Sequence, residues 1–519
     1  MAKSSRVFAL LIPVLLVPVL LGGCNMGPNF LRPRADLPDS FLKPGEGARS
    51  SAVAEPMDAA WWSVFGDPEL TKLAGRIAAE NPDVQIAAIR LAESRAQAGV
   101  TASGEFPAIN ANGSYTREKQ SKNGAISLIG GSPGASPATQ SNGLGGRQGG
   151  IPQSGGASGA ATNPFDLFQS GFDASWELDI WGRVRRQVES AGAAIDASAE
   201  TRRDMQVSMV AELARDYLQL RGTQESLRIT RANLDTARQS AKLTAQRQAG
   251  GLTTELDVAN AQSLVNETEA AVPQLEQQQA LLINAIGFLL GEHPGSLTAE
   301  LTPPRPGPLA PPRVPIGLPS ELARRRPDIR RAEAQLHAAT ADIGAAQADF
   351  YPRITLSGSA ALQALQFRKL GDFSSLTYGF GPSISIPIFE GGRLKSTLEL
   401  RRLQQREAAV TYQRTVLQAW REVDDALSAY GFEQQRLGRL KAQAANARQA
   451  LGYAQQRYTQ GVSDYLEVLT AQRTLLSAES NLASSGATVN TDLVALYKAL
   501  GGGWETAFPR RRARAATNR

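Results

Sequence analysis

The chain has 519 residues, of which 42% are hydrophobic, so it is long enough for several domains and has ample apolar material for a core. Its single cysteine excludes an internal disulfide. The formal net charge of +6 comes from the two ends: two cations precede residue 7 and five arginines follow residue 509, and without these seven the charge is −1. This distribution does not support nucleic-acid binding.

Residues 1–23 are predicted to be a cleaved export signal. A positively charged start precedes an apolar run over 7–21, which is too short for a comfortable membrane span and ends in small residues before Cys24. This site resembles a bacterial lipoprotein box, in which the cysteine thiol is acylated; the alternative is an ordinary signal with an incidental cysteine. Acyl chains on Cys24 would anchor the mature chain, and Asn25 resembles the sorting signal for the outer membrane.

Four segments alternate between apolar and polar residues, which is the pattern of strands. In one of them, Phe172, Ala174 and Trp176 alternate with Asp173 and Ser175. The predicted strands cover about 107–118, 168–181, 353–362 and 376–389. A sheet with two different faces fits a soluble sandwich, and it also fits a membrane barrel with lipid outside and water inside.

Two proline-free segments, about 183–248 and 393–458, predict very long helices. Each would span roughly 100 Å at 1.5 Å per residue. The second has a heptad seam over 416–430, as in coiled coils. Return helices are predicted over 253–290, with a kink at Pro273, and over 463–500.

The tips of these helical hairpins contain Gly251 and Gly461, which predict tight turns. Thr253 and Ser463 follow them and are predicted to be the N-caps of the return helices. Shorter helices are expected near 82–104 and 327–349, ahead of a proline that precedes a strand.

The strand-and-helix pattern occurs twice. Pro82, Asp83, Leu91 and Gly99 recur 245 positions later, and a second set of residues recurs at an offset of 210. The second set is Arg247, Gly251, Leu256, Val258, Ala261, Gln262, Leu290 and Gly291. Such a long internal repeat indicates duplicated architecture. The change of offset places an insertion of about 35 residues in the first copy, within the Gly- and Ser-rich loop 119–164.

The predicted organisation follows from these patterns. Residues 292–319 carry nine prolines and form a linker between the copies. The segments are 1–23 signal, 24–80 lipidated N-terminal segment, 81–291 first repeat, 292–325 proline-rich segment, 326–501 second repeat and 502–519 basic tail. The family resemblance described below implies that 24–80 and 292–325 belong to an equatorial domain.

Four strands of membrane type cannot close a barrel, and open sheet edges are not tolerated in lipid. If the strands lie in a bilayer, several chains must share one barrel, and their amphipathic helices would continue it as a tube. The sequence therefore predicts an oligomeric channel with a membrane end and a long helical end.

The chain resembles the TolC-like outer-membrane efflux proteins, specifically their NodT/OprM-type lipoprotein subclass of tripartite RND efflux systems. The matching stretches are Trp61–Leu70, Trp176–Arg183, Gly317–Pro319, Arg326–Ile329 and Leu496–Trp504. The resemblance implies a homotrimer with a shared 12-stranded barrel, a periplasmic α-helical barrel and an equatorial mixed domain. It also implies a periplasmic adaptor, an inner-membrane pump of the RND type and outer-membrane lipid as partners, and export of drugs or other small molecules.

The hairpin tips hold the candidate functional residues. Asp257 and Glu467 occupy matching repeat positions, and in a trimer they would place six carboxylates around one axis, favouring cations. The alternative is that an acid in a first helical turn simply stabilises the helix dipole, by about 0.3–1 kcal/mol. The remaining tip residues, implied by the resemblance to contact the adaptor, are Gly251, Leu252, Thr253, Gly461, Val462 and Ser463.

By the same resemblance, Tyr458 matches a gate tyrosine and Leu466 an apolar constriction residue. Ordinary packing between neighbouring helices is the alternative for both. The chain departs from the family pattern at Thr470, where the subclass has an acid, and at Ser463, where distant members have an arginine. Phe168, Trp176 and Trp181 are candidates for an interfacial aromatic belt; the alternative is a lipid-facing stripe without that role.

Other classes of protein fit less well. The only histidines are His293 and His337, and no phosphate loop or nucleotide fingerprint is present, so no enzyme, cofactor, catalytic residue or metal site is predicted. The alternatives left open are an exit duct for type I protein secretion or metal-ion efflux, and a non-conducting structural envelope lipoprotein. Few Met and His residues argue weakly against a dedicated soft-metal route.

Overall fold

The computed structural model describes residues 25–33, 51–53, 58–119, 164–305, 313–315, 322 and 324–506. The predicted signal, Cys24, nearly all of the loop 119–164 and the end of the basic tail lie outside the described residues. The chain divides into two compact units. The first comprises Met1–Met26, Val100–Arg185 and Ala345–Leu394, and the second comprises Gly27–Gly99, Arg186–Gly344 and Lys395–Arg519. Each sequence repeat contributes to both units.

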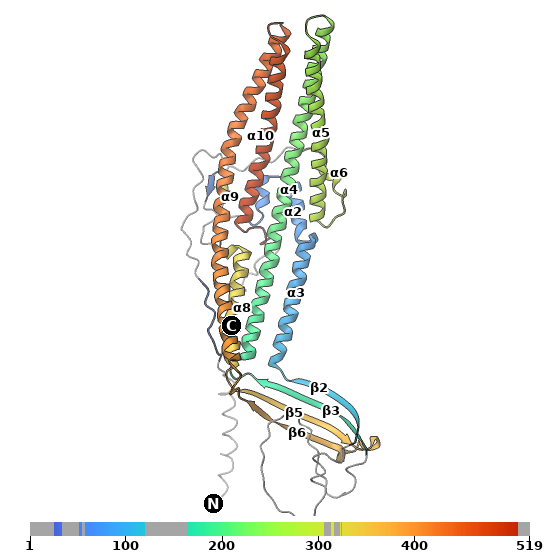
Figure 1. The fold of residues 1–519 in the computed structure, drawn as a ribbon, viewed down its shortest axis with the longest axis vertical. Helices are drawn as coiled ribbons and strands as arrows, with labels where there is room; N and C mark the ends of the chain where they lie inside the picture. Colours follow the sequence, from blue (N-terminus) through green and yellow to red (C-terminus); the bar gives the residue numbers. More distant parts are fainter. Residues whose placement is uncertain are drawn as a thin grey trace, which may run out of the picture. The chain divides into compact units, whose positions relative to one another are not determined.

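The first unit contains one four-stranded antiparallel sheet (Figure 1). Its strands are β2 (Ala108–Glu118), β3 (Phe165–Leu178), β5 (Arg353–Ala364) and β6 (Leu376–Ser385), in the order β2-β3-β5-β6. The central pair joins the two repeats, because β3 comes from the first and β5 from the second. Within the described residues, β2 and β6 each have one unpaired edge.

The cross-strand register gives the sheet one apolar and one polar face, since directly opposed residues share a face. Phe172 is paired with Ala111 on one side and Ala360 on the other, and Ala360 is paired in turn with Tyr378. Large apolar side chains of this face are exposed, up to 85% at Phe380. The opposite face carries Asn, Ser, Thr, Asp and Gln, as the alternation predicts.

Two strand ends differ from the predicted ones. β5 ends at Ala364, within two residues of the predicted end near 362. β3, in contrast, ends at Leu178 rather than near 181, because the Ile180 N–H donates to the Leu178 carbonyl in a tight turn. β6 ends at Ser385 rather than near 389, shortly before Pro387, which has no N–H for a ladder.

The indole N–H groups of Trp176 and Trp181 donate to backbone carbonyls of Glu105 and Pro352, each at 2.9 Å.

The second unit is built around two helical hairpins (Figure 1). In the first, α4 (Arg183–Ala249) is followed by α5 (Glu255–Leu289); in the second, α9 (Arg393–Thr459) is followed by α10 (Tyr465–Ala499). α4 and α9 have 67 residues each, or roughly 100 Å. α5 continues through Pro273 as one helix. None of the helices within the described ranges combines the length and apolar character needed to cross a membrane.

The N-caps of the return helices lie one residue later than predicted. They are Thr254 and Asp464, not Thr253 and Ser463. The turn geometry explains the shift. Gly251 and Gly461 are left-handed (φ +72° and +74°), and the N–H of the residue after each glycine donates to the arginine carbonyl five residues earlier, so one more residue belongs to the turn.

Shorter elements complete the described chain. The helices are η1 (Trp61–Phe65), α2 (Pro68–Glu80), α3 (Pro82–Ala102), η2 (Ser103–Glu105), α6 (Thr298–Leu301), α8 (Pro327–Ala348), η4 (Phe367–Lys369) and η5 (Phe373–Ser375). Strands β1 (Ser51–Val53) and β4 (Arg313–Pro315) pair in parallel.

The tryptophan-rich motif at 61–70 is a packing anchor of the second unit. Trp61 is 1% exposed, stacks on Tyr497 with 5.2 Å between ring centroids, and donates its indole N–H to the Gly502 carbonyl. Asp67 caps α2 and accepts a 2.6 Å hydrogen bond from the Tyr217 hydroxyl of α4. The motif therefore fastens the N-terminal segment to the middle of α4 and to the C-terminal end of α10.

Candidate functional site at the hairpin tips

The two hairpin tips present matching apolar side chains to solvent. Leu252 and Leu256 of the first tip are 70% and 69% exposed, and their repeat equivalents Val462 and Leu466 are 65% and 59% exposed. Leu466 is therefore not packed within its own chain. Burying such side chains against a partner is favourable, by about 25 cal/mol per Å² of apolar surface. Each tip is suited to contact an apolar partner.

Asp257 belongs to a capping box at the start of α5. Its carboxylate accepts hydrogen bonds from the Thr254 N–H (3.2 Å), the Thr254 hydroxyl (2.9 Å) and the Thr253 hydroxyl, while the Thr254 hydroxyl accepts from the Asp257 N–H. Burial alone raises the pKa of Asp257, but the hydrogen bonds from Thr253 and Thr254 outweigh it and hold the pKa below its usual range. The acid is thus ionised and locally engaged.

Glu467 is engaged differently. Its carboxylate forms an ion pair with Arg457 on the same hairpin, with 3.3 Å between Oε2 and Nη1, and both side chains are about half exposed. The N-cap bond at this helix comes from Asp464, which accepts from the Glu467 N–H at 3.3 Å. The two acids that match in sequence therefore have different partners.

Tyr458 is buried between the hairpins, at 4% exposure. The Arg247 guanidinium of the first hairpin lies 4.5 Å from its ring centroid and donates from Nη1 to its carbonyl at 2.6 Å. The Tyr465 ring meets it edge-on, with 5.6 Å between centroids. Sequence reasoning missed Arg247 and Tyr465. The signal for Arg247 was its recurrence as Arg457 in the repeat.

Below the tips, polar bonds also join the hairpins. The Gln472 side chain donates to the Ser240 hydroxyl at 2.6 Å in a buried position. Leu234, Leu264 and Leu469 belong to the apolar cluster that both hairpins share. A cavity of about 260 Å³ adjoins Tyr458 and Tyr465.

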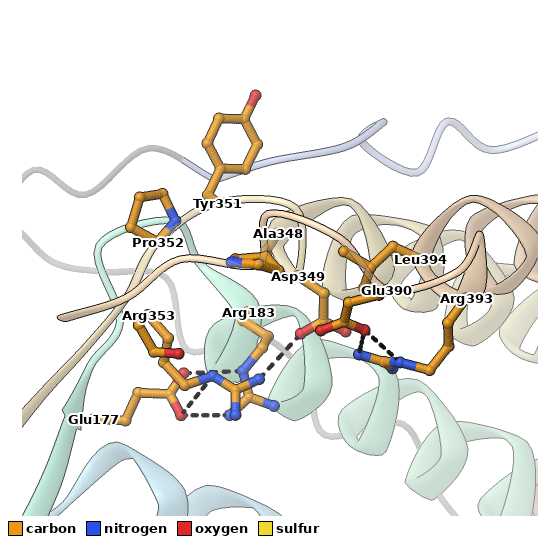
Figure 2. Close-up of a pocket in the computed structure, with 12 residues that line it drawn as sticks. Glu177, Arg183, Ala348, Asp349, Tyr351, Pro352, Arg353, Glu390, Arg393 and Leu394 are labelled. Carbon is orange, nitrogen blue, oxygen red and sulfur yellow. Dashed lines mark hydrogen bonds and ion pairs between the residues drawn. The ribbon is translucent and has the colours of Figure 1, made fainter. Parts of the chain in front are cut away.

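A separate charge cluster lies in the first unit, where strands meet helix ends (Figure 2). Arg183 binds Glu177 through two hydrogen bonds, at 2.9 and 2.7 Å, and Arg353 lies 3.8 Å from Glu177 and 3.4 Å from Asp349. Arg393 pairs with Glu390, and Tyr351 points away from the charges in Figure 2. These six charges, which are Glu177, Arg183, Asp349, Arg353, Glu390 and Arg393, balance one another around a cavity of about 220 Å³. The cluster fastens strand ends to helix starts.

The histidines form no catalytic arrangement in the parts of the chain that the structure describes. His337 Nε2 lies 3.0 Å from a Glu189 carboxylate oxygen, and its ring stacks on Phe30 with 4.5 Å between centroids. His293 lies beside the Pro294 carbonyl. Across the described ranges, no group of three His, Cys, Asp or Glu residues could hold a metal ion.

A two-faced sheet with open edges, long helical hairpins and apolar tips define a protein of the outer-membrane channel class. The model of the family described as "Outer membrane efflux protein" matches residues 73–292 and 318–502. The chain belongs to this family, which confirms the resemblance, the outer-membrane location and the efflux function predicted from the sequence.

Similar proteins cover nearly the whole chain. The solvent efflux pump outer membrane protein SrpC of Pseudomonas putida is 33% identical over 510 residues, which is 97% of this chain and 98% of that protein. The probable outer membrane lipoprotein SilC of Salmonella typhimurium is 29% identical, over 93% of this chain and 97% of that one. The solved structure of the outer-membrane channel OprN matches with a TM-score of 0.80 and 33% identity, over 93% of this chain and all of that chain. The predicted fold class is thereby confirmed.

Proposed function

We propose that the chain is the passive exit duct of a tripartite efflux pump, working with a periplasmic adaptor and an inner-membrane pump of the RND type. The observation that carries this proposal is the pairing of a two-faced sheet with rods of roughly 100 Å in one chain. Such rods are long enough to extend far beyond a membrane surface. Export of small molecules is supported by the similarity to SrpC, whose name describes it as the outer membrane protein of a solvent efflux pump. No catalytic step is part of the proposal.

The functional form is proposed to be a homotrimer. In the part of the chain that the structure describes, the main sheet has four strands with open edges at β2 and β6, and unpaired edges are not tolerated in lipid. Three copies would close a 12-stranded barrel by pairing β6 of one copy with β2 of the next, within the range of known membrane barrels. The exposed apolar face would meet outer-membrane lipid, and the segments 24–80 and 292–325 would form the equatorial domain.

The hairpin tips are proposed to contact the adaptor. Leu252 and Val462 are exposed apolar residues at equivalent positions beside Gly251 and Gly461. In a trimer they would form six similar apolar contacts, which suits an adaptor arranged around the same axis. Thr253 and Ser463 complete the two turns.

The periplasmic end is proposed to be gated. Tyr458 and Leu466 would narrow the passage, and Asp257 and Glu467 would favour cations there. The support is their position, since all four lie within about two helical turns of a tip glycine.

Cys24 is proposed to be acylated, because the residues before it resemble a lipoprotein box and SilC is described as a probable lipoprotein. The test is metabolic labelling with radioactive palmitate of cells that express the full chain. Label should enter the wild type and not Cys24→Ser; equal labelling of both would contradict the anchor.

The channel proposal is tested by purifying the full chain and measuring its mass in detergent and its conductance in planar bilayers. A trimer that changes its gel migration on heating and conducts after addition of the adaptor is expected. A purified trimer that never conducts, even with the adaptor, would instead favour a structural envelope protein.

A further inference from the structure

Two arginines at equivalent repeat positions have different partners. Arg457 pairs with Glu467 on its own hairpin, at 3.3 Å. Arg247 instead crosses from α4 to the second hairpin, where its Nη1 donates to the Tyr458 carbonyl at 2.6 Å. At this position the first copy therefore makes a cross-hairpin contact, whereas the second copy makes a contact within its own hairpin.

The contact fits the chemistry of a helix end. The last carbonyls of a helix lack intrahelical donors and carry partial negative charge, so a cation stabilises them. The Tyr458 carbonyl already accepts from the Gly461 N–H at 3.0 Å, and Arg247 adds a charged second donor. The guanidinium also lies 4.5 Å from the Tyr458 ring centroid, within the range of a cation–π interaction.

The hydroxyl of Tyr458 takes no part in this contact. It is buried and has no hydrogen-bond partner among the described residues, and the same holds for the Tyr465 hydroxyl. A buried hydroxyl without a partner destabilises the arrangement that buries it. The adjoining cavity of about 260 Å³ leaves room for both rings to move. Among the described residues, the bond from Arg247 therefore joins the hairpins beside Tyr458 without a contribution from either tyrosine hydroxyl.

We propose that Arg247 is a positioning residue that holds the first hairpin against the C-terminal end of α9, and that Tyr458 contributes its ring and carbonyl but not its hydroxyl. This contact, the Arg247 clasp, keeps the tips together. The effect of the clasp on conduction rests on the proposed gate. The clasp itself is independent of that proposal.

The test is hydrogen–deuterium exchange of the full-length channel in detergent, followed at the amides of Gly461 and Val462. Both amides donate to the end of α9, at 3.0 Å each. Arg247→Gln should accelerate their exchange about tenfold, although the substitution is in the other hairpin. The matched control is Arg238→Gln, because Arg238 of α4 pairs with Glu269 of its own hairpin at 2.9 Å; it should leave this exchange unchanged.

Two further variants separate the parts of the clasp. Arg247→Lys keeps the charge without the planar fork and should give an intermediate rate. Tyr458→Phe keeps the ring and the carbonyl, so exchange should be unchanged or slower. Faster exchange in Tyr458→Phe, or an unchanged rate in Arg247→Gln, would overturn the clasp.

Leak conductance of the same variants in bilayers tests the gate separately. A higher leak in Arg247→Gln together with faster exchange supports both proposals. Faster exchange with an unchanged leak keeps the clasp and counts against a gate at this seam. A higher leak with unchanged exchange overturns the clasp and leaves the gate in place.

Discussion

Arg457 and Glu467 form an ion pair within the second hairpin, with 3.3 Å between Nη1 and Oε2, and the arginine therefore offsets the negative charge of the Glu467 carboxylate. The carboxylate of the repeat-equivalent acid Asp257 instead accepts hydrogen bonds from the Thr253 and Thr254 hydroxyls and the Thr254 N–H, and among the described residues no ion pair of Asp257 accompanies them. The two acids of one chain therefore present unequal charge to the channel axis proposed above.

Arg457→Gln is expected to increase cation selectivity, because it leaves the Glu467 carboxylate without its neutralising partner. Glu467→Gln should have the opposite effect, since it leaves Arg457 uncompensated. Reversal potentials of single channels in a salt gradient measure both. The prediction fails if the two variants shift the reversal potential in the same direction.

Asp257 should stabilise the first turn of α5 in a pH-dependent way. Because the folded-state pKa is lowered, its contribution is complete above the unfolded pKa of about 3.9 and is lost as the pH falls through the lower folded value. Asp257→Asn should therefore speed amide exchange in this turn at neutral pH, and the difference should shrink toward about pH 3. Glu255→Gln, an exposed acid of the same turn, is the control and should have a smaller effect.

The sequence was sufficient for the four strands of the main sheet and for the long helices, and insufficient for the partners of individual side chains. Period-two alternation identified all four strands of the sheet, and the absence of proline identified the two long helices, because both signals are local. The N-caps were misplaced by one residue because a left-handed glycine can be followed by one or two turn residues before a helix begins. The bond from Arg247 to Tyr458 joins residues 211 positions apart, and no local pattern distinguishes it from the Arg457 pair.

Gly222 is expected to be essential for the close packing of α4 on α10. A Cβ added there would lie 2.5 Å from the Ala487 Cβ, and Ala487 has no flexible end that could move away. Gly222→Ala should therefore destabilise the chain by about 1–3 kcal/mol through overpacking, although alanine is the better helix former.

The control for this packing is Gly438→Ala in α9, where an added Cβ meets nothing within 4 Å. It should stabilise the helix by up to about 1 kcal/mol. Thermal unfolding followed by circular dichroism compares the two. Adding Ala487→Gly to Gly222→Ala should restore stability, and failure to do so would contradict a direct clash.

Asp492 of α10 should weaken the folded chain at neutral pH. Burial, together with the nearby negative charge of Glu433, raises the pKa of Asp492 to about 6. The folded chain therefore holds a proton between about pH 4 and 6 that the unfolded chain releases, so stability falls as the pH rises through this window and stays lower above it.

Asp492→Asn mimics the protonated side chain and should raise the melting temperature at about pH 8, with little gain at about pH 4.5. Asp425→Asn is the matched control, because Asp425 of α9 is 73% exposed and lies 3.8 Å from Arg421. It should change the melting temperature little at either pH. Since the prediction depends on a charge that forms as the pH rises through about 6, an equal gain for Asp492→Asn at both pH values would refute it.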